Sequence, residues 1–348
     1  MTIEQERKLF ERIPAPLLSW YETHKRKLAW RDEPTPYHVW VSEIMLQQTR
    51  VEAVKDYYAR FVAALPDIRS LAACEEEKLL KLWEGLGYYS RVRNMQKAAK
   101  QILVEFGGKF PETVEALKTL SGVGSYTAGA IASIAFGQPV AAVDGNVFRV
   151  ISRLTANPTV ISEPKYRNYL ETELSKVYPK GKRERSAFTQ SLFELGALVC
   201  KPLSPACESC PLSGLCEAKK RGEQKRFPVL PPKKAKREED VFVFLLQTPS
   251  GFCIRRRENG VLKGMNEFPS EPQQGKTAEQ ILNEWGVYAF TERKRENFTH
   301  IFTHIKWNIT CVWLETEDAP FDTYSLAEIE ETVSLPTAFK QCLKIITD

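Results

Sequence analysis

Four of the eight cysteines in this 348-residue chain lie within seventeen consecutive residues, with the spacing Cys-x6-Cys-x2-Cys-x5-Cys. Four thiolates within reach of one centre suit either a tetrahedral zinc ion or an iron–sulfur cluster. Structural zinc usually uses two closely spaced cysteine pairs, and only Cys207 and Cys210 form such a pair here. The spacing therefore favours an iron–sulfur cluster, which would fix the loop that carries all four ligands: Cys200, Cys207, Cys210 and Cys216.

The rest of the composition excludes several classes of protein. The hydrophobic share of 43% and the charged share of 27% are those of a globular chain, not of a disordered or collagen-like one. No apolar run approaches the ~18 residues of a membrane span; the longest lies near 128–136. The polar segment 1–11 has no apolar core, so it is not a secretory signal. Together with the cysteine cluster, these features predict that the protein is located in a reducing cytoplasm.

The first two hundred residues have helical periodicity, and the last hundred do not. Apolar residues from Val51 to Leu65 recur three or four apart, and similar patterns follow, separated by glycine breaks. Strand-like runs appear at 241–247, 252–256 and 307–314, with helices expected at 277–285 and near the C-terminus. We therefore predict an α+β multidomain protein, with an all-α domain (1–218, metal loop 200–216) and a small α+β domain (241–348).

The two predicted domains are joined by a basic segment, Lys219–Asp240. It contains nine Lys or Arg and four Asp or Glu, so its net charge of +5 equals that of the whole chain. Pro228, Pro231 and Pro232 prevent a continuous helix. We interpret it as an extended linker that attracts phosphate, although a merely solvated charged loop has the same composition.

A glycine-rich turn at Gly122 and Gly124 lies between two helical stretches and runs into Ser125. Such a turn can direct backbone N–H groups at a phosphate from a helix N-terminus. An ordinary helix–helix turn would look the same when taken alone. About twenty residues later the chain reads Asp144-Gly145-Asn146, and the cysteine cluster follows.

These three elements, in this order, resemble the helix-hairpin-helix DNA glycosylase superfamily with a C-terminal iron–sulfur loop, and in particular its adenine DNA glycosylase (MutY-type) family. The resemblance implies a 4Fe–4S cluster on the four cysteines and a base excision repair enzyme. It implies hydrolysis of the N-glycosidic bond of adenine opposite 8-oxoguanine or guanine in double-stranded DNA, by a monomer at the nucleoid in a bacterial cytosol. Four further segments carry the match: 26–31 (RKLAWR), 40–49 (WVSEIMLQQT), 85–91 (GLGYYSR) and 194–200 (ELGALVC).

The chemistry of that reaction calls for two carboxyl groups. Departing adenine must be protonated, and the sugar becomes a cation that needs a nearby anion, as in glycoside hydrolysis. By resemblance, Glu43 is the general acid and Asp144 the stabilising carboxylate. Taken alone, Glu43 would be an ordinary helix carboxylate and Asp144 part of an ordinary turn. Glu43 stays protonated near neutral pH only in an apolar site, which neighbours in the sequence can supply: Trp30, Ile44, Leu46 and Val51.

Tyr126 bears on the reaction type. Related glycosylases that also cut the strand carry a nucleophilic Lys at this hairpin position, and a phenol cannot form a Schiff base. We therefore expect base excision without strand cleavage, with Tyr126 and Asn146 holding Asp144 and the attacking water. A plain buried aromatic is the alternative interpretation of Tyr126.

The target base must be extruded from the duplex. By resemblance, Gln48 and Tyr88 act as the wedge that fills the gap, and Trp30, Arg31 and Gln190 line the adenine pocket. Simple core packing is the alternative for the tyrosine. Three arginines are candidates for phosphate contacts: Arg91, Arg93 and Arg149.

Residues 241–348 resemble the family's 8-oxoguanine-reading domain, which is similar to Nudix hydrolases. Those enzymes hold magnesium with clustered carboxylates. Gln280 and Asn283 stand where acids are expected and only Glu284 remains, so we predict recognition rather than hydrolysis. The lesion-reading loop, usually Phe-Ser-His, reads Phe302-Thr303-His304. A second segment, usually Gly-Leu-Trp-Glu-Phe-Pro, has Asn266 in place of the tryptophan.

Two other functions remain open at this point. A glycosylase/lyase for oxidised pyrimidines shares the hairpin and the cluster, but it wants Lys at position 126. A protein that binds lesions without cleaving them would have lost one of the two carboxylates, Glu43 and Asp144, and both are present.

Overall fold

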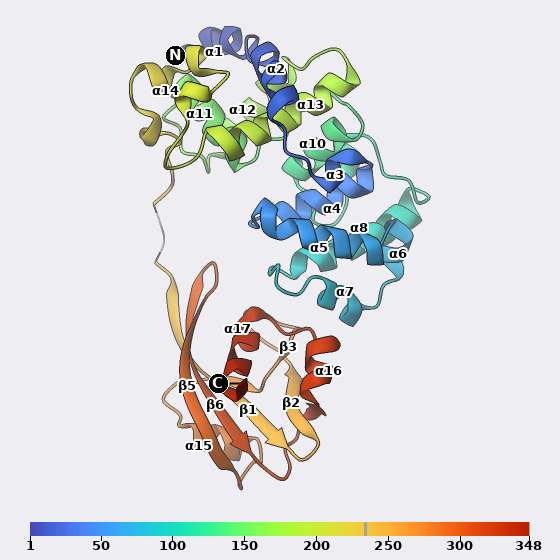
Figure 1. The fold of residues 1–348 in the computed structure, drawn as a ribbon, viewed down its shortest axis with the longest axis vertical. Helices are drawn as coiled ribbons and strands as arrows, with labels where there is room; N and C mark the ends of the chain where they lie inside the picture. Colours follow the sequence, from blue (N-terminus) through green and yellow to red (C-terminus); the bar gives the residue numbers. More distant parts are fainter. Residues whose placement is uncertain (233–234, 348) are drawn as a thin grey trace. The chain divides into compact units, whose positions relative to one another are not determined.

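The computed structural model describes residues 1–232 and 235–347, and its chain divides into two compact units (Figure 1). The first unit contains residues 1–73 and 93–232. The second contains residues 74–92 together with the C-terminal part from residue 233 onward. Neither unit is therefore one continuous stretch of sequence.

The first unit is helical, as the periodicity of its apolar residues predicts. Many helices start at an extended residue followed by proline or at a side-chain cap; Thr35, for example, accepts from the N–H of His38 before α4. Helix α8 begins in the second unit and continues into the first. Its helices are α1 (Ile3–Phe10), α2 (Pro14–His24), α3 (Ala29–Asp32), α4 (Pro36–Leu46), α5 (Val51–Ala64), α6 (Ile68–Ala73), α8 (Ser90–Glu105), α9 (Val114–Leu117), α10 (Ser125–Ile134), α11 (Gly145–Thr155), α12 (Pro164–Ser175), α13 (Lys182–Glu194) and α14 (Glu217–Lys220).

The glycine-rich turn joins α9 to α10, so the expected helical hairpin is present. Gly122 has φ +75°, and a Cβ there would come within 2.7 Å of the Asn94 Cβ. Only glycine therefore fits the turn without strain. Gly124 precedes the first turn of α10 as its N-cap residue.

A hydrophobic core at one end of this unit is built from α1, α2, α11, α12 and α13. Phe10, Leu17, Phe148 and Phe188 are fully buried in it. The half-buried cysteines of the metal loop pack against the same core, so the loop has a rigid support: Cys200, Cys210 and Cys216.

The second unit contains a seven-stranded mixed sheet with the order β3-β2-β1-β6-β5, in which β4 also pairs with β1 and β7 with β2. The long central strands β1 and β6 run parallel, and β5 and β6 form an antiparallel hairpin. The strands are β1 (Arg237–Thr248), β2 (Gly251–Arg256), β3 (Asn266–Glu267), β4 (Ser270–Pro272), β5 (Thr291–Ile301), β6 (Ile305–Glu315) and β7 (Asp322–Tyr324).

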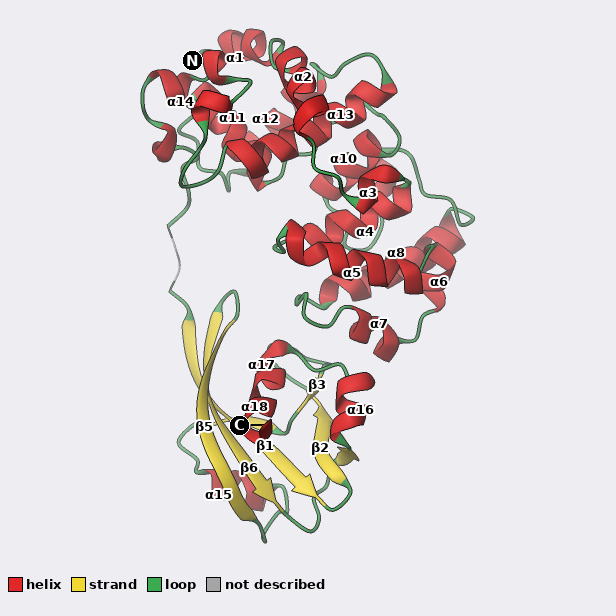
Figure 2. Cartoon of the chain, viewed as in Figure 1, coloured by secondary structure: helices red, strands yellow, loops and turns green. Residues whose placement is uncertain are grey.

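Helices cover both faces of this sheet (Figure 2). Along β1, Val241, Val243 and Leu245 belong to the core with α16, α17 and α18, whereas Phe242 and Phe244 belong to the core with α15. A strand buried on both faces has no polar alternation, which explains the continuous apolar run VFVFLL. The helices of the unit are α7 (Glu76–Leu82), α15 (Ala278–Glu284), α16 (Leu326–Glu331), α17 (Thr337–Lys340) and α18 (Lys344–Thr347).

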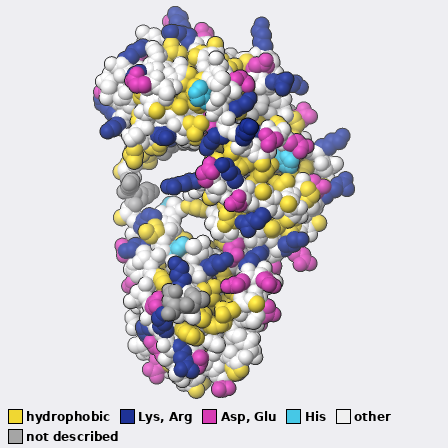
Figure 3. Space-filling view, viewed as in Figure 1, with side chains coloured by type: hydrophobic (Ala, Val, Ile, Leu, Met, Phe, Trp, Pro, Cys, Tyr) yellow, Lys and Arg dark blue, Asp and Glu magenta, His cyan; other side chains and the backbone are white. Residues whose placement is uncertain are grey.

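The α+β multidomain fold class is thus confirmed. Strand β1 begins at Arg237, inside the segment interpreted as a linker, and Lys233 and Lys234 lie outside the described residues. No helix in the described part of the chain is long and apolar enough to cross a membrane. On the face drawn in Figure 3, basic and acidic side chains are interspersed, in keeping with the small net charge.

Candidate active site

A cleft of about 1310 Å³ in the first unit brings together the four predicted catalytic residues and four of the eight predicted substrate-binding residues. Three of the four apolar neighbours proposed for Glu43 also line it, namely Trp30, Leu46 and Val51; Ile44 is buried but is not part of the lining. The predicted site residues in its wall come from α3, α4, α10, α11, α13 and the turn after α4: Trp30, Arg31, Glu43, Gln48, Tyr126, Asp144, Asn146 and Gln190.

Glu43 projects from α4 and is only 5% exposed. Burial raises the pKa of its carboxyl to about 7, and the negative charge of Asp144 adds to this rise. The Tyr126 hydroxyl donates a hydrogen bond to Glu43 Oε2, and this bond and the charge of Arg31 act in the opposite direction. A carboxyl with this pKa is protonated in a large fraction of molecules at neutral pH, so it can donate a proton.

Asp144 is the N-cap residue of α11, where backbone N–H groups point towards it. Its Oδ1 accepts from the N–H of Val147 at 2.7 Å, and its Oδ2 accepts from Asn146 Nδ2 at 2.7 Å. Burial raises the pKa of Asp144 above its ordinary value, and these donors oppose that rise by stabilising the charged form without cancelling it. The carboxylate is therefore fixed in direction and held by donors that favour its anion.

Two charged residues of the cleft wall, Arg26 and Glu194, were given no role by the sequence analysis. Glu194 is fully buried and accepts from Arg26 Nε at 2.9 Å and from Arg31 Nη2 at 2.6 Å. Burial acts to raise the pKa of Glu194, but the two guanidinium groups hold it below its usual value. Both Arg26 and Glu194 lie in segments that carry the family resemblance, which is the signal that could have identified them.

Arg149, a candidate for phosphate contact, has its hydrogen bonds inside the protein. Its Nε donates to the carbonyl of Cys200 at 2.7 Å, and its Nη2 donates to Asn146 Oδ1 at 2.7 Å and to the carbonyl of Gly196 at 2.8 Å. This side chain thus ties the turn that holds Asp144 to the start of the cysteine loop.

The two proposed wedge residues share an uncommon backbone conformation. Gln48 has φ +62° and Tyr88 has φ +48°. Residues other than glycine rarely adopt this region, and such strain is concentrated at functional sites. Gln48 lines the cleft in the first unit, and Tyr88 belongs to the second unit, where its hydroxyl shares a hydrogen bond with Thr303.

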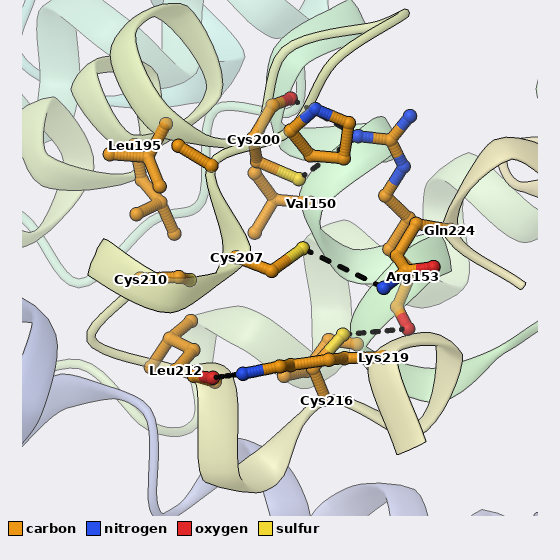
Figure 4. A pocket seen from close by; sticks show the side chains of 15 residues that line it. Val150, Arg153, Leu195, Cys200, Cys207, Cys210, Leu212, Cys216, Lys219 and Gln224 are labelled. Atoms are coloured by element: carbon orange, nitrogen blue, oxygen red, sulfur yellow. Dashed lines mark hydrogen bonds between the residues drawn. The ribbon is translucent and has the colours of Figure 1, made fainter. Parts of the chain in front are cut away.

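The four clustered cysteines line one small cavity, shown in Figure 4. Cys200 follows a π-helix (Leu195–Val199), and Cys216 precedes α14. Arg153 Nη1 lies 3.4 Å from Cys200 Sγ, and Gln224 Nε2 lies 3.8 Å from Cys207 Sγ, so two of the sulfurs face N–H donors.

The donor set fits an iron–sulfur cluster. Burial raises the pKa of the Cys210 thiol to about 11, and the charges of the other three sulfurs add to this. Four thiolates can therefore coexist here only around a compensating cation. Four thiols around one cavity supply the all-sulfur donor set that an iron–sulfur cluster uses.

In the second unit, the predicted reading loop forms the turn between β5 and β6. The Phe302 ring packs against Trp307 with ring centroids 4.9 Å apart, whereas Thr303 and His304 are exposed. The loop thus has a half-buried anchor and two polar side chains open to solvent. Glu284, the carboxylate left from the Nudix pattern, pairs with Lys276 at 2.8 Å.

Three family models match the chain in the order that the sequence predicts. Residues 41–176 match the HhH-GPD superfamily of base excision DNA repair proteins, residues 200–216 match the iron–sulfur binding domain of endonuclease III, and residues 241–344 match the NUDIX domain. The second match confirms the 4Fe–4S cluster as the cofactor.

Whole-chain relatives and solved structures agree with these matches. Adenine DNA glycosylases are 35% identical in Mus musculus, over 88% of this chain and 71% of that protein, and 33% identical in Buchnera aphidicola (strain Sg), over 84% of each. The structure of a thermostable thymine-DNA glycosylase is 26% identical with a TM-score of 0.55, covering 64% of this chain and all of the other. The structure of a non-covalent endonuclease III–DNA complex is 26% identical with a TM-score of 0.53, covering 65% of this chain and all of the other. The chain is a DNA-binding N-glycosyl hydrolase and belongs to the adenine DNA glycosylase family.

Proposed function

We propose that this enzyme removes adenine paired with 8-oxoguanine, or with guanine, and leaves the DNA strand uncut. The observation that carries the proposal is the pair of carboxyl groups in one cleft, with the pKa of Glu43 raised to about 7 and Asp144 held by N–H donors. The two environments match the two roles that adenine departure requires.

In the proposed mechanism, the bond between adenine and the sugar breaks as Glu43 gives its proton to the departing base. Asp144 stabilises the cationic sugar by its charge. Water then adds to the sugar carbon and gives up a proton, which returns to the Glu43 carboxylate that the first step left. Asn146 holds Asp144 through its 2.7 Å hydrogen bond, and Tyr126 holds Glu43. The cluster, when bound, ties the four cysteines together and so keeps the loop, and the Cys200 carbonyl that Arg149 contacts, in place.

The absence of an amine at position 126 supports excision without a lyase step. A Schiff base needs a primary amine, and the hairpin presents a phenol whose hydroxyl is already used by Glu43. The resulting abasic site would therefore remain until base or another enzyme cleaves it.

Access to the base requires that the nucleotide leave the duplex. We propose Gln48 and Tyr88 as the wedge, supported by their strained backbone conformation. Trp30, Arg31 and Gln190 would line the adenine pocket, since all three lie in the wall of the cleft with Glu43. The hairpin residues would contact the phosphate backbone: Gly122, Gly124 and Ser125.

The C-terminal domain, residues 241–348, would read 8-oxoguanine through Phe302, Thr303 and His304, after the linker 219–240 and the catalytic domain 1–218. The exposure of Thr303 and His304 beside the half-buried Phe302 supports this role. We also propose that the enzyme works as a monomer at the nucleoid in a bacterial cytosol. The relative from a bacterium supports the last point.

The test is incubation with duplexes that contain adenine opposite 8-oxoguanine or opposite guanine. We expect alkali-labile sites with no direct nicking, and a faster reaction opposite 8-oxoguanine. Glu43→Gln should lower excision at least about 1000-fold because it removes the proton donor, with duplex binding retained. Direct nicking would instead indicate a lyase, bound but unchanged DNA a binding protein, and full activity of Glu43→Gln another acid.

A further inference from the structure

The short segment 74–92, which carries Tyr88, packs with the C-terminal part of the chain as a piece of the second unit. In the sequence it lies inside the region that matches the HhH-GPD family model. The glycosylase polypeptide thus contributes a helix, α7, and the following turn to the unit that contains the reading loop. The contacts of α7 show how this is achieved.

Lys81, near the end of α7, binds the C-terminal end of α16. Its Nζ donates to the carbonyl of Val333 at 3.0 Å and to that of Ile329 at 3.4 Å. A cation at a helix C-terminus satisfies carbonyl groups that have no partner within the helix. The side chain is only 21% exposed, so these hydrogen bonds are shielded from water.

Glu84 completes the contact on the other side. Its carboxylate accepts from the N–H of Leu335 at 3.0 Å and from Lys340 Nζ at 3.3 Å, and it pairs with Lys81 at 3.1 Å. It is 11% exposed. Ser334, which lies between Val333 and Leu335, donates from its Oγ to the carbonyl of Leu80 at 3.2 Å. Lys81 and Glu84 therefore bind the whole connection from α16 to α17.

A second, more exposed contact involves the residue that departs from the family pattern. Asn266 Nδ2 donates to Glu77 Oε2 at 3.3 Å, and Arg256 forms an ion pair with the same carboxylate. Since both members of this ion pair are about half exposed, it contributes less than the buried contacts of Lys81 and Glu84. Asn266 thus donates to a carboxylate of α7.

We propose that Lys81 and Glu84 are positioning residues that keep Tyr88 in register with the reading loop and so set the preference for 8-oxoguanine over guanine. The inference rests on the proposed function, in which Tyr88 and Thr303 both act at the lesion. Their hydroxyl groups share a hydrogen bond. Tyr88 follows Glu84 by one short turn, so a loosened α7 moves the wedge relative to Thr303, while Glu43 and Asp144 belong to the other unit.

The experiment compares Lys81→Met and Lys81→Arg in the full-length enzyme, with Lys78→Met, an exposed lysine on the same helix, as the matched control. Single-turnover excision is measured with adenine opposite 8-oxoguanine and opposite guanine. Lys81→Met should reduce the ratio of the two rates about tenfold, since charge-assisted hydrogen bonds are lost. Lys81→Arg, which keeps the charge, should recover part of the ratio, and Lys78→Met should keep all of it.

Hydrogen exchange of residues 74–92 supplies an independent readout. Exchange there should rise in Lys81→Met and in Glu84→Gln and stay at the wild-type level in Lys78→Met. An unchanged rate ratio in Lys81→Met, or unchanged exchange, overturns the proposal. If the wild-type enzyme shows no preference for 8-oxoguanine, the proposed function fails, and the exchange result alone then decides whether Lys81 holds α7.

Discussion

The two carboxyl groups of the cleft differ in what surrounds them. Glu43 lies in the last turn of α4 with its side chain buried, and it accepts a hydrogen bond from the Tyr126 hydroxyl. Asp144 sits at the start of α11, where two N–H donors and the positive end of the helix favour its charged form. Burial raises the pKa of both carboxyl groups, but that of Glu43 reaches about 7 and only Asp144 has donors from a helix start, which supports the proposed roles of acid and anion.

The first prediction concerns the hydroxyl of Tyr126. Its hydrogen bond lowers the pKa of Glu43, so Tyr126→Phe should raise that pKa by about one unit. The protonated form of Glu43 is required, so wild-type excision should fall as the pH rises through about 7. The variant should keep a larger share of its own maximal rate at pH values above 7, as single-turnover rates across the pH range will show.

The control is Tyr169→Phe, which removes a hydroxyl that donates to Glu6 at 2.8 Å and does not line the cleft. Its pH profile should match that of the wild type. If the rate of Tyr126→Phe falls at the same pH as that of the wild type, or at a lower pH, the assigned hydrogen bond or the assigned acid is wrong.

At this scale the sequence predicted which residues gather in the cleft, but not how the charged ones pair. Glu43, Tyr126 and Asp144 could be named because their motifs are specific. The partners of Arg149 could not, because a lone arginine in a sequence does not show whether it meets solvent or a carbonyl. In the fold, Arg149 donates to three acceptors, one three residues away and two about fifty residues away.

Among the elements, the π-helix Leu195–Val199 joins α13, which forms part of the cleft wall, to the loop that carries the four cysteines. Glu194 ends α13 just before it, and Cys200 follows it. A Cβ on Gly196 would lie 2.5 Å from the Cβ of Asn146, the residue that holds Asp144. The extra residue per turn of a π-helix thus coincides with a close approach of two site elements, as is frequent at functional sites.

The second prediction is that Gly196→Ala pushes Asn146 out of place. Overpacking of this kind costs about 1–3 kcal/mol of stability, and excision should fall at least about tenfold because Asp144 loses its aligned partner. The cluster absorbance should persist, since the cysteines do not move away. Gly214→Ala is the matched control, because a Cβ at Gly214 meets no atom within 4 Å. Equal loss in both variants would place the effect in the metal loop instead.

The sequence predicted the helical character of the first unit and three of the seven strands in the described residues, namely β1, β2 and β6. Strand β5 (Thr291–Ile301) was missed because it is rich in charged residues and most of its side chains are exposed. Its hydrogen bonds to β6, which the sequence does not reveal, make it a strand. The apolar strands β1 and β6 and the hairpin before α10 were found, because burial on two faces and a glycine turn leave a local signal.

For the whole molecule, the sequence predicted two domains, but it did not indicate that residues 74–92 belong to the second unit. The stretch 74–92 is flanked by helices of the first unit, and nothing local marks it as part of the second. The contacts that place it there join residues about 250 positions apart, such as Lys81 and Val333. Hydrophobic periodicity reports which side of a helix is buried but not which domain buries it.

The net charge of the chain leads to the last prediction. The basic segment 219–240 accounts for the whole excess of +5, but several of its cations are paired internally, such as Lys220 with Glu217 at 2.7 Å. In the described part of the chain Lys225 has no ion-pair partner, and it lines the cleft that contains Glu43.

Lys225→Ala should therefore weaken duplex binding and reduce the slope of log affinity against log salt by about 0.9, the contribution of one phosphate contact. Lys220→Ala, the control, should leave the slope nearly unchanged, since its charge is already neutralised. Binding titrations over a range of salt concentrations measure both, and parallel lines for the wild type and Lys225→Ala would mean that this charge does not meet DNA.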